Sequence, residues 1–489
     1  MSTTVSPAAP PPLLAEKPDF PTWLPAMLVK ELRQGLRTRG FVGAFIIFQV
    51  IMVISMLIAV VSAMFSPTMA RGGIGTGING VFWFVVGIQL LFVTPARGFG
   101  GLRTEIETRS LDLLVLTRLT AWRIVLGKWT SLFVQALLLV VAVLPYGIIR
   151  YFMGSVDLME DAALCAAMLM GCAVMTAAGL AASGLPKIFR GITMVATIYF
   201  LFQGMGAFFG RRVMYGGGPF AHASFIDLWP LWVNGALLLG ILLVTAVRLI
   251  APPAENHAPL TRSLALAATV PAVLLTLFGK TQVARDQWAF AMILLAMVCA
   301  VELASMRWPM APHWRPWMVR GLAARVLGRF ALPGWPSAFL FALASTAVVI
   351  LGCFLPRAYL GVELARGAWL TVLATTALVF PAVALSFVSR AGRSPGLLYG
   401  GVFVVSSLLA ALAGILSNGP GNLEQALKFV APFPGAGFWI ALFSPESLTP
   451  LVFTLQTIVA IAVLCVGTWQ SRVYWQYLRK LESHLQARK

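Results

Sequence analysis

Residues 41–69 read FVGAFIIFQVIMVISMLIAVVSAMFSPTM, a stretch that contains no charged residue. A second uncharged stretch, SLFVQALLLVVAVLPYGII, covers residues 131–149. A helix that crosses a lipid bilayer needs about 20 predominantly apolar residues, and each stretch is long enough. These stretches predict an all-α polytopic membrane protein.

The composition of the whole chain supports the same class. Of 489 residues, 59% are hydrophobic and only 11% are charged, and the mean hydropathy is +0.86. A soluble globular domain has about 25% charged residues, so this chain has too few to cover a surface in water. Soluble enzymes, secreted disulfide scaffolds and free nucleic-acid-binding proteins are therefore excluded, and we expect no nucleic-acid partner. The four histidines, His222, His257, His313 and His484, are scattered too widely to suggest a metal site.

Apolar runs separated by charged or Pro/Gly-rich breaks predict about twelve transmembrane helices. They lie near 41–64, 80–96, 129–149, 162–183, 191–209, 228–247, 263–279, 287–306, 335–355, 368–388, 397–416 and 449–470. We expect a six-helix unit at 22–250 and a second one at 251–470, flanked by a disordered cytoplasmic tail at 1–21 and a basic cytoplasmic tail at 471–489. The third to fifth and the ninth to eleventh predicted helices are offset by the same length of chain, so a parallel repeat of two halves is an open alternative to two unrelated units.

The basic residues predict the orientation. With both termini in the cytoplasm, 27 of the 36 Lys and Arg residues lie in cytoplasmic segments and 9 lie outside. This bias is the one that the positive-inside rule describes. The net charge of +19 is therefore explained by topology and does not indicate nucleic-acid binding.

The segment TWLPAMLVKELRQGLRTR, residues 22–39, precedes the first predicted span and has the period of an amphipathic helix. A basic amphipathic helix at this place fits one that lies in the cytoplasmic headgroup layer and turns into the membrane at Gly40. Its apolar face would hold Leu24, Met27, Leu28, Leu32 and Leu36. Its contacts with membrane lipids would come from Trp23, Lys30, Arg33 and Arg37.

The cytoplasmic loop at about 97–128 is long, and long loops in compact folds usually carry function. Arg103, Glu105, Glu107 and Arg109 would extend the second predicted helix, and Ser110 would cap a short helix with Leu111, Leu114, Val115 and Leu119 on one face. Thr120 would cap the next helix, which continues through Arg123 into the membrane. An apolar helix face with a charged rim is suited to docking on a partner protein.

This loop carries a family resemblance. The stretch ETRSLDLLVLTRLTAWRIVLGK, residues 107–128, resembles the signature of type-two ABC exporter permeases (type V fold), in which an acidic helix end leads through a Leu-rich coupling helix to a hydrophobic-Gly-Lys entry. The amphipathic helix at 22–39 is similar to the elbow helix of that family, and the resemblance extends over about 22–250. The chain departs from the pattern at Ser110, where the family often has Gly, and at Arg118, where it often has Pro.

The resemblance implies a permease subunit in the bacterial inner membrane that pairs with separate ABC-type ATPase subunits and with a second permease copy, or with its own second half as a pseudo-dimer. The residues that it implies for coupling to the ATPase are Glu105, Glu107, Arg109, Leu111, Asp112, Leu114, Leu119 and Arg123. ATP would be bound by the partner, because the chain shows no P-loop: Gly127 and Lys128 are followed by Trp129. We therefore expect no enzyme activity and no cofactor in this chain.

A second cytoplasmic loop, 307–334, occupies the corresponding place in the second half. It contains no Asp or Glu, and its RVLGR at 325–329 faintly resembles RIVLGK at 123–128.

Two other functions are considered. An ion-coupled secondary transporter with twelve helices would need ionisable groups near the middle of the membrane, whereas Glu302 lies near a predicted helix end. A membrane enzyme would need convergent acidic or nucleophilic residues. Its one candidate, the external cluster Asp157, Glu160 and Asp161, is better explained as a solvated loop.

Overall fold

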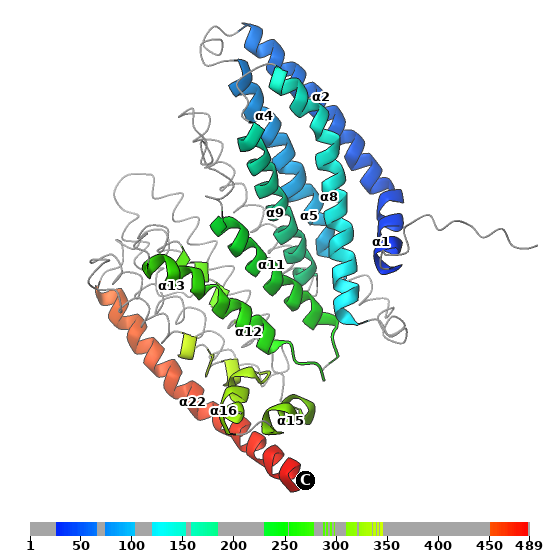
Figure 1. Ribbon diagram of the computed structural model, residues 1–489. Coiled ribbons are helices and arrows are strands. Elements are labelled where there is room, and N and C mark those ends of the chain that lie inside the picture. The colour runs from blue at the N-terminus through cyan, green and yellow to red at the C-terminus, as the bar shows by residue number, and fades with distance from the viewer. Residues whose placement is uncertain are drawn as a thin grey trace, which may run out of the picture.

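The computed structural model describes residues 26–65, 74–102, 120–152, 158–183, 229–252, 254–277 and 450–487, together with parts of 287–345 (Figure 1). Within these ranges every regular element is a helix. The prediction of an all-α chain is confirmed for this part of the protein.

Six helical segments in the described ranges are long and apolar enough to cross a membrane. They match the first four predicted spans and the sixth and seventh. Their bounds are Arg39–Ile58, Val81–Gly100, Ala121–Phe152, Asp161–Ala182, Trp229–Ile250 and Ala258–Leu275. The predicted spans 191–209, 368–388 and 397–416 lie outside the described residues, so the full number of twelve stays a prediction, as does the two-unit repeat.

The amphipathic segment forms helix α1 (Ala26–Arg37), and the first span forms α2 (Arg39–Phe65). The two helices meet at Thr38, whose Oγ1 donates to the Gly35 carbonyl at 2.7 Å and accepts from the Phe41 N–H at 3.3 Å. Thr38 therefore acts as the cap that turns the chain, and the bend precedes the expected position at Gly40. Trp23 lies outside the described residues.

The second span consists of α4 (Ile74–Ile88), the π-helical segment η1 (Gln89–Val93), α5 (Thr94–Ala96) and the 3-10 segment η2 (Arg97–Gly100). In η1 the Gln89 carbonyl accepts both the N–H of Thr94 and its Oγ1, the latter at 3.0 Å. Pro95 has no N–H to donate, so a local change of hydrogen-bonding pattern at this point is expected.

Three further spans complete the first bundle: α8 (Ala121–Phe152), α9 (Leu158–Ala182) and α11 (Trp229–Ile250). The second span and α9 approach to backbone contact, since a Cβ added at Gly179 would lie 3.1 Å from backbone atoms of Pro95, Gly98 and Phe99. Small residues allow such contacts between membrane helices, where packing rather than water drives association.

The second part of the described chain begins with α12 (Ala258–Ala267) and α13 (Thr269–Leu277). The predicted loop 307–334 contains two short helices, α15 (Ala311–Val319) and α16 (Leu322–Ala331). After α16 the chain bends by 111° at Leu332–Gly334, where Gly334 has a φ of 113° that favours glycine.

The last element is α22 (Pro450–Ala487), which continues without a break from the predicted span at 449–470 into the segment expected as a basic tail. Its C-terminal half lies beside α15 and the bend after α16 (Figure 1). Trp314, Leu332 and Leu478 form a small buried cluster there, and Tyr474 Oη donates to the Pro333 carbonyl at 2.9 Å. The apolar periodicity of residues 474, 478, 481 and 485 explains why this segment is a docked helix.

Candidate functional site

The apolar and basic residues of helix α1 lie on different faces, as the sequence predicts. Lys30, Arg33 and Arg37 are exposed, whereas Met27 and Leu32 are buried. The buried face contacts the first turns of α8, so the apolar side of this helix is covered in part by protein. Its basic side is exposed.

Gly127 and Lys128, which carry the family resemblance at the entry into α8, form the docking point for α1. A Cβ added at Gly127 would lie 2.8 Å from Cγ of Met27, so the absence of a side chain lets the two helices approach. Next to it, Lys128 Nζ lies 3.2 Å from Oε1 of Glu31, and the two side chains are only 10% and 15% exposed. The Gly-Lys pair thus combines a close packing contact with a partly buried ion pair.

The N-terminal end of the 97–128 loop is held by a polar cluster between four elements. Arg97 donates from Nη1 to Oε1 of Gln135 on α8, and its guanidinium lies 5.2 Å from the ring centroid of Phe41 on α2. Gln135 is almost completely buried and lies against Gly35 of α1, where an added Cβ would be 2.4 Å from its Nε2. Through these contacts the end of the second span packs against α1, α2 and α8.

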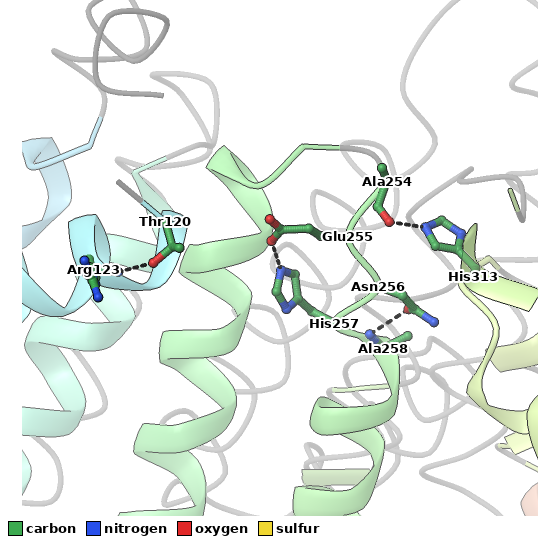
Figure 2. Close-up of polar contacts among 8 residues, drawn as sticks. All are labelled: Thr120, Arg123, Ala254, Glu255, Asn256, His257, Ala258 and His313. Atoms are coloured by element: carbon green, nitrogen blue, oxygen red, sulfur yellow. Dashed lines mark hydrogen bonds and ion pairs between the residues drawn. The ribbon is translucent and has the colours of Figure 1, made fainter. Parts of the chain in front are cut away.

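The C-terminal end of the loop is the predicted cap. Thr120 Oγ1 accepts the N–H of Arg123 at 3.4 Å (Figure 2). The Thr120 carbonyl accepts the N–H of Ile124 at 3.3 Å. The prediction that Thr120 caps α8 is confirmed, and the Arg123 side chain is exposed. Leu102 before the loop and Ala121 after it are buried in the same cluster with residues of α9 and α11.

The remaining coupling candidates lie outside the described residues. They are Glu105, Glu107, Arg109, Leu111, Asp112, Leu114 and Leu119. The structure describes the residues on either side of this segment, Leu102 and Thr120, and their neighbours; we call these residues the frame.

Beside this frame the linker between α11 and α12 connects the two parts of the chain (Figure 2). Glu255 Oε2 lies 3.1 Å from Nε2 of His257, whose ring stands edge-on to Trp122 of α8 with the centroids 6.4 Å apart. Asn256 accepts the N–H of Ala258 at 3.1 Å and donates to the Ala331 carbonyl of α16 at 2.8 Å. The linker therefore touches both the start of α8 and α16.

His313 of α15 completes this junction. Its Nδ1 accepts the N–H of Met310 at 3.2 Å, so its Nε2 carries the proton that is donated to the Ala254 carbonyl at 2.9 Å. No sequence pattern indicates this role, because a single histidine in a basic loop has many possible partners.

Arg262 of α12 is a second buried group at the junction that the sequence did not reveal. Its guanidinium donates to the Phe330 carbonyl and, at 2.8 Å, to Ser337 Oγ, and so joins α12 to the bend after α16.

At the far end of α8 the structure corrects one interpretation of the sequence. Asp161 does not belong to a solvated loop: it forms an ion pair with Arg150, which is 1% exposed, and its Oδ1 accepts Trp83 Nε1 at 3.2 Å. The Arg150 guanidinium also lies 4.1 Å from the ring centroid of Phe82. Arg150 is buried and Asp161 is partly buried between α4, α8 and α9, which explains the pairing, since a buried charge is costly unless it is paired. Asp157 lies outside the described residues, as does the side chain of Glu160.

Among the described residues, no group of three or more His, Cys, Asp or Glu side chains could hold a metal ion. The sequence matches no family model, no curated protein and no solved structure.

Proposed function

We propose that this chain is the membrane-spanning permease subunit of an ATP-driven exporter, with energy supplied by separate ABC-type ATPase subunits that dock on residues 103–119. The observation that carries the proposal is the docking of α1 on Gly127 and Lys128 of α8. In the resembling family an elbow helix and a hydrophobic-Gly-Lys entry occur together, and here the two are in direct contact.

The frame around the loop suits the transmission of movement. Arg97 and Gln135 hold the loop's beginning, and the Thr120 cap holds its end. Both ends enter one buried cluster, so a partner that moves residues 103–119 would move the second span and α8 together. A loop with loosely attached ends would absorb the same displacement.

A mutation in the expected docking helix tests the proposal. Replacement of Leu114 by Asp would place a carboxylate in an apolar contact, and leaving it unpaired there costs several kcal/mol. We expect the amount of ABC-type ATPase that copurifies with the chain to fall strongly in Leu114→Asp. The matched control is Val473→Asp, because Val473 is an exposed apolar residue on the C-terminal half of α22. Equal amounts of ATPase in both variants and in the unmodified protein would refute docking at this loop.

The ion-coupled transporter is the second candidate, because Asp161 and Arg150 are ionisable groups within candidate membrane spans. A coupling carboxylate must change its proton or ion occupancy in each cycle. Asp161 instead accepts from both Arg150 and Trp83. It lies near the start of α9, and Arg150 lies near the end of α8, so neither is at the middle of its helix. We therefore expect Asp161→Asn to affect stability, while the dependence of transport on ATP is unchanged.

A further inference from the structure

A cavity of about 590 Å³ lies between α4, α8 and α9, beside the Arg150–Asp161 pair. Sites for small molecules have roughly 300–1,000 Å³, so the cavity is of ligand size. Its walls include Phe82 and Trp83 of α4, Val143 and Gly147 of α8, and Cys165 and Leu169 of α9. Among the described residues that line it, Asp161 is the only charged one.

The cavity opens toward the surroundings of the bundle. Leu144, Ile148, Tyr151 and Leu158 line it and are each more than half exposed. All but Leu158 lie within a candidate membrane span, so in a bilayer this opening would face lipid. A cavity with such walls offers water too few polar partners, and an apolar occupant is favoured.

The length of the cavity along α8 fits one acyl chain. Its lining residues on α8 extend from Val140 to Phe152, which is roughly 18 Å at 1.5 Å per residue. The hydrocarbon core of a bilayer is about 30 Å thick, so the cavity runs along about one leaflet.

The polar end of the cavity lies where a headgroup would be. Arg150 and Asp161 lie close to the end of α8 and the start of α9, respectively. A carboxylate offers about four acceptor positions, and Arg150 and Trp83 each donate to one of them. A headgroup that donates hydrogen bonds can therefore be bound by Asp161.

We propose that this cavity is a binding site for a phospholipid, with one acyl chain between α4, α8 and α9 and a hydrogen-bond-donating headgroup, such as ethanolamine, at Asp161. The site does not depend on the proposed coupling to an ATPase, since it lies at the opposite end of α8.

Gly147 gives a direct test, because a Cβ added there meets no atom within 4 Å and Gly147 lines the cavity. Gly147→Phe should fill the space without disturbing the helices. Gly43→Phe is the matched control, since Gly43 of α2 is also open but does not line the cavity. Ala162→Phe is a second filling variant from the α9 side.

The full-length chain is purified in detergent, incubated with phosphatidylethanolamine or phosphatidylcholine, and the retained lipid is counted by native mass spectrometry. We expect the unmodified chain and Gly43→Phe to retain phosphatidylethanolamine in preference to phosphatidylcholine. Gly147→Phe and Ala162→Phe should bind it at least about tenfold more weakly while unfolding at a similar temperature. Equal retention by the filled and control variants would overturn the proposal. So would equal retention of the two lipids, or a bound amphiphile that is not a phospholipid.

Discussion

Removing the ammonium of Lys128 should weaken the docking of α1 on α8. Lys128→Met keeps most of the side-chain volume but leaves the Glu31 carboxylate without its ion pair at 3.2 Å. Exposed pairs contribute about 0–1 kcal/mol, whereas breaking a buried pair costs about 3–5 kcal/mol. With side chains that are 10% and 15% exposed, this pair lies between the two cases, and we expect a cost of about 1–3 kcal/mol.

A free-energy change of this size corresponds to a roughly 5- to 150-fold shift in the equilibrium for detachment of α1. Hydrogen exchange of the α1 amides, followed by mass spectrometry in detergent, measures this shift directly. The control is Lys30→Met, which removes a charge from the exposed face of the same helix and should leave exchange unchanged.

The double variant Glu31→Gln with Lys128→Met should exchange more slowly than Lys128→Met alone, because no unpaired carboxylate remains. Equal exchange in Lys128→Met and Lys30→Met would refute the docking of α1 through this pair.

Three further predictions concern other contacts. Gly179→Ala should lower the stability of the bundle by about 1–3 kcal/mol, because its Cβ would meet backbone atoms at 3.1 Å. Gly43→Ala should be neutral, and thermal unfolding in detergent compares the two variants. Tyr474→Phe should lower the stability by about 0.5–1.5 kcal/mol, because the hydrogen bond to the Pro333 carbonyl is lost. We expect faster proteolysis of the C-terminal half of α22, and unchanged proteolysis would argue against this contact. Thr120→Ala should cost about 0.5–2 kcal/mol at the start of α8, detected as faster exchange of the Arg123 amide, and Thr120→Ser should restore protection.

The spans and caps of the first bundle follow from local features of the sequence. α2 and α8 contain long uncharged runs, and Thr120 precedes the first apolar residues of α8. The positions of these two helices and of the cap could therefore be predicted from neighbouring residues alone. The division of α1 into a buried and a basic face follows from its helical period in the same way.

The contacts between helices could not be predicted in this way. Glu31 and Lys128 are 97 residues apart, and their pairing depends on how α1 crosses α8. The predicted spans that end at 149 and begin at 162 leave Arg150 and Asp161 at opposite ends of an external loop, because hydropathy places charged residues outside a span and does not show that two helix ends bring them together. The π-helical segment at Gln89 likewise depends on Thr94 and Pro95 within the packed bundle.

The most direct test of the proposed function is the composition of the complex that the unmodified chain forms in mild detergent. The account predicts that an ABC-type ATPase copurifies with it in a fixed ratio and that this complex hydrolyses ATP. Purification of the chain without any such ATPase, together with transport by the reconstituted chain that follows an ion gradient and needs no ATP, would contradict it.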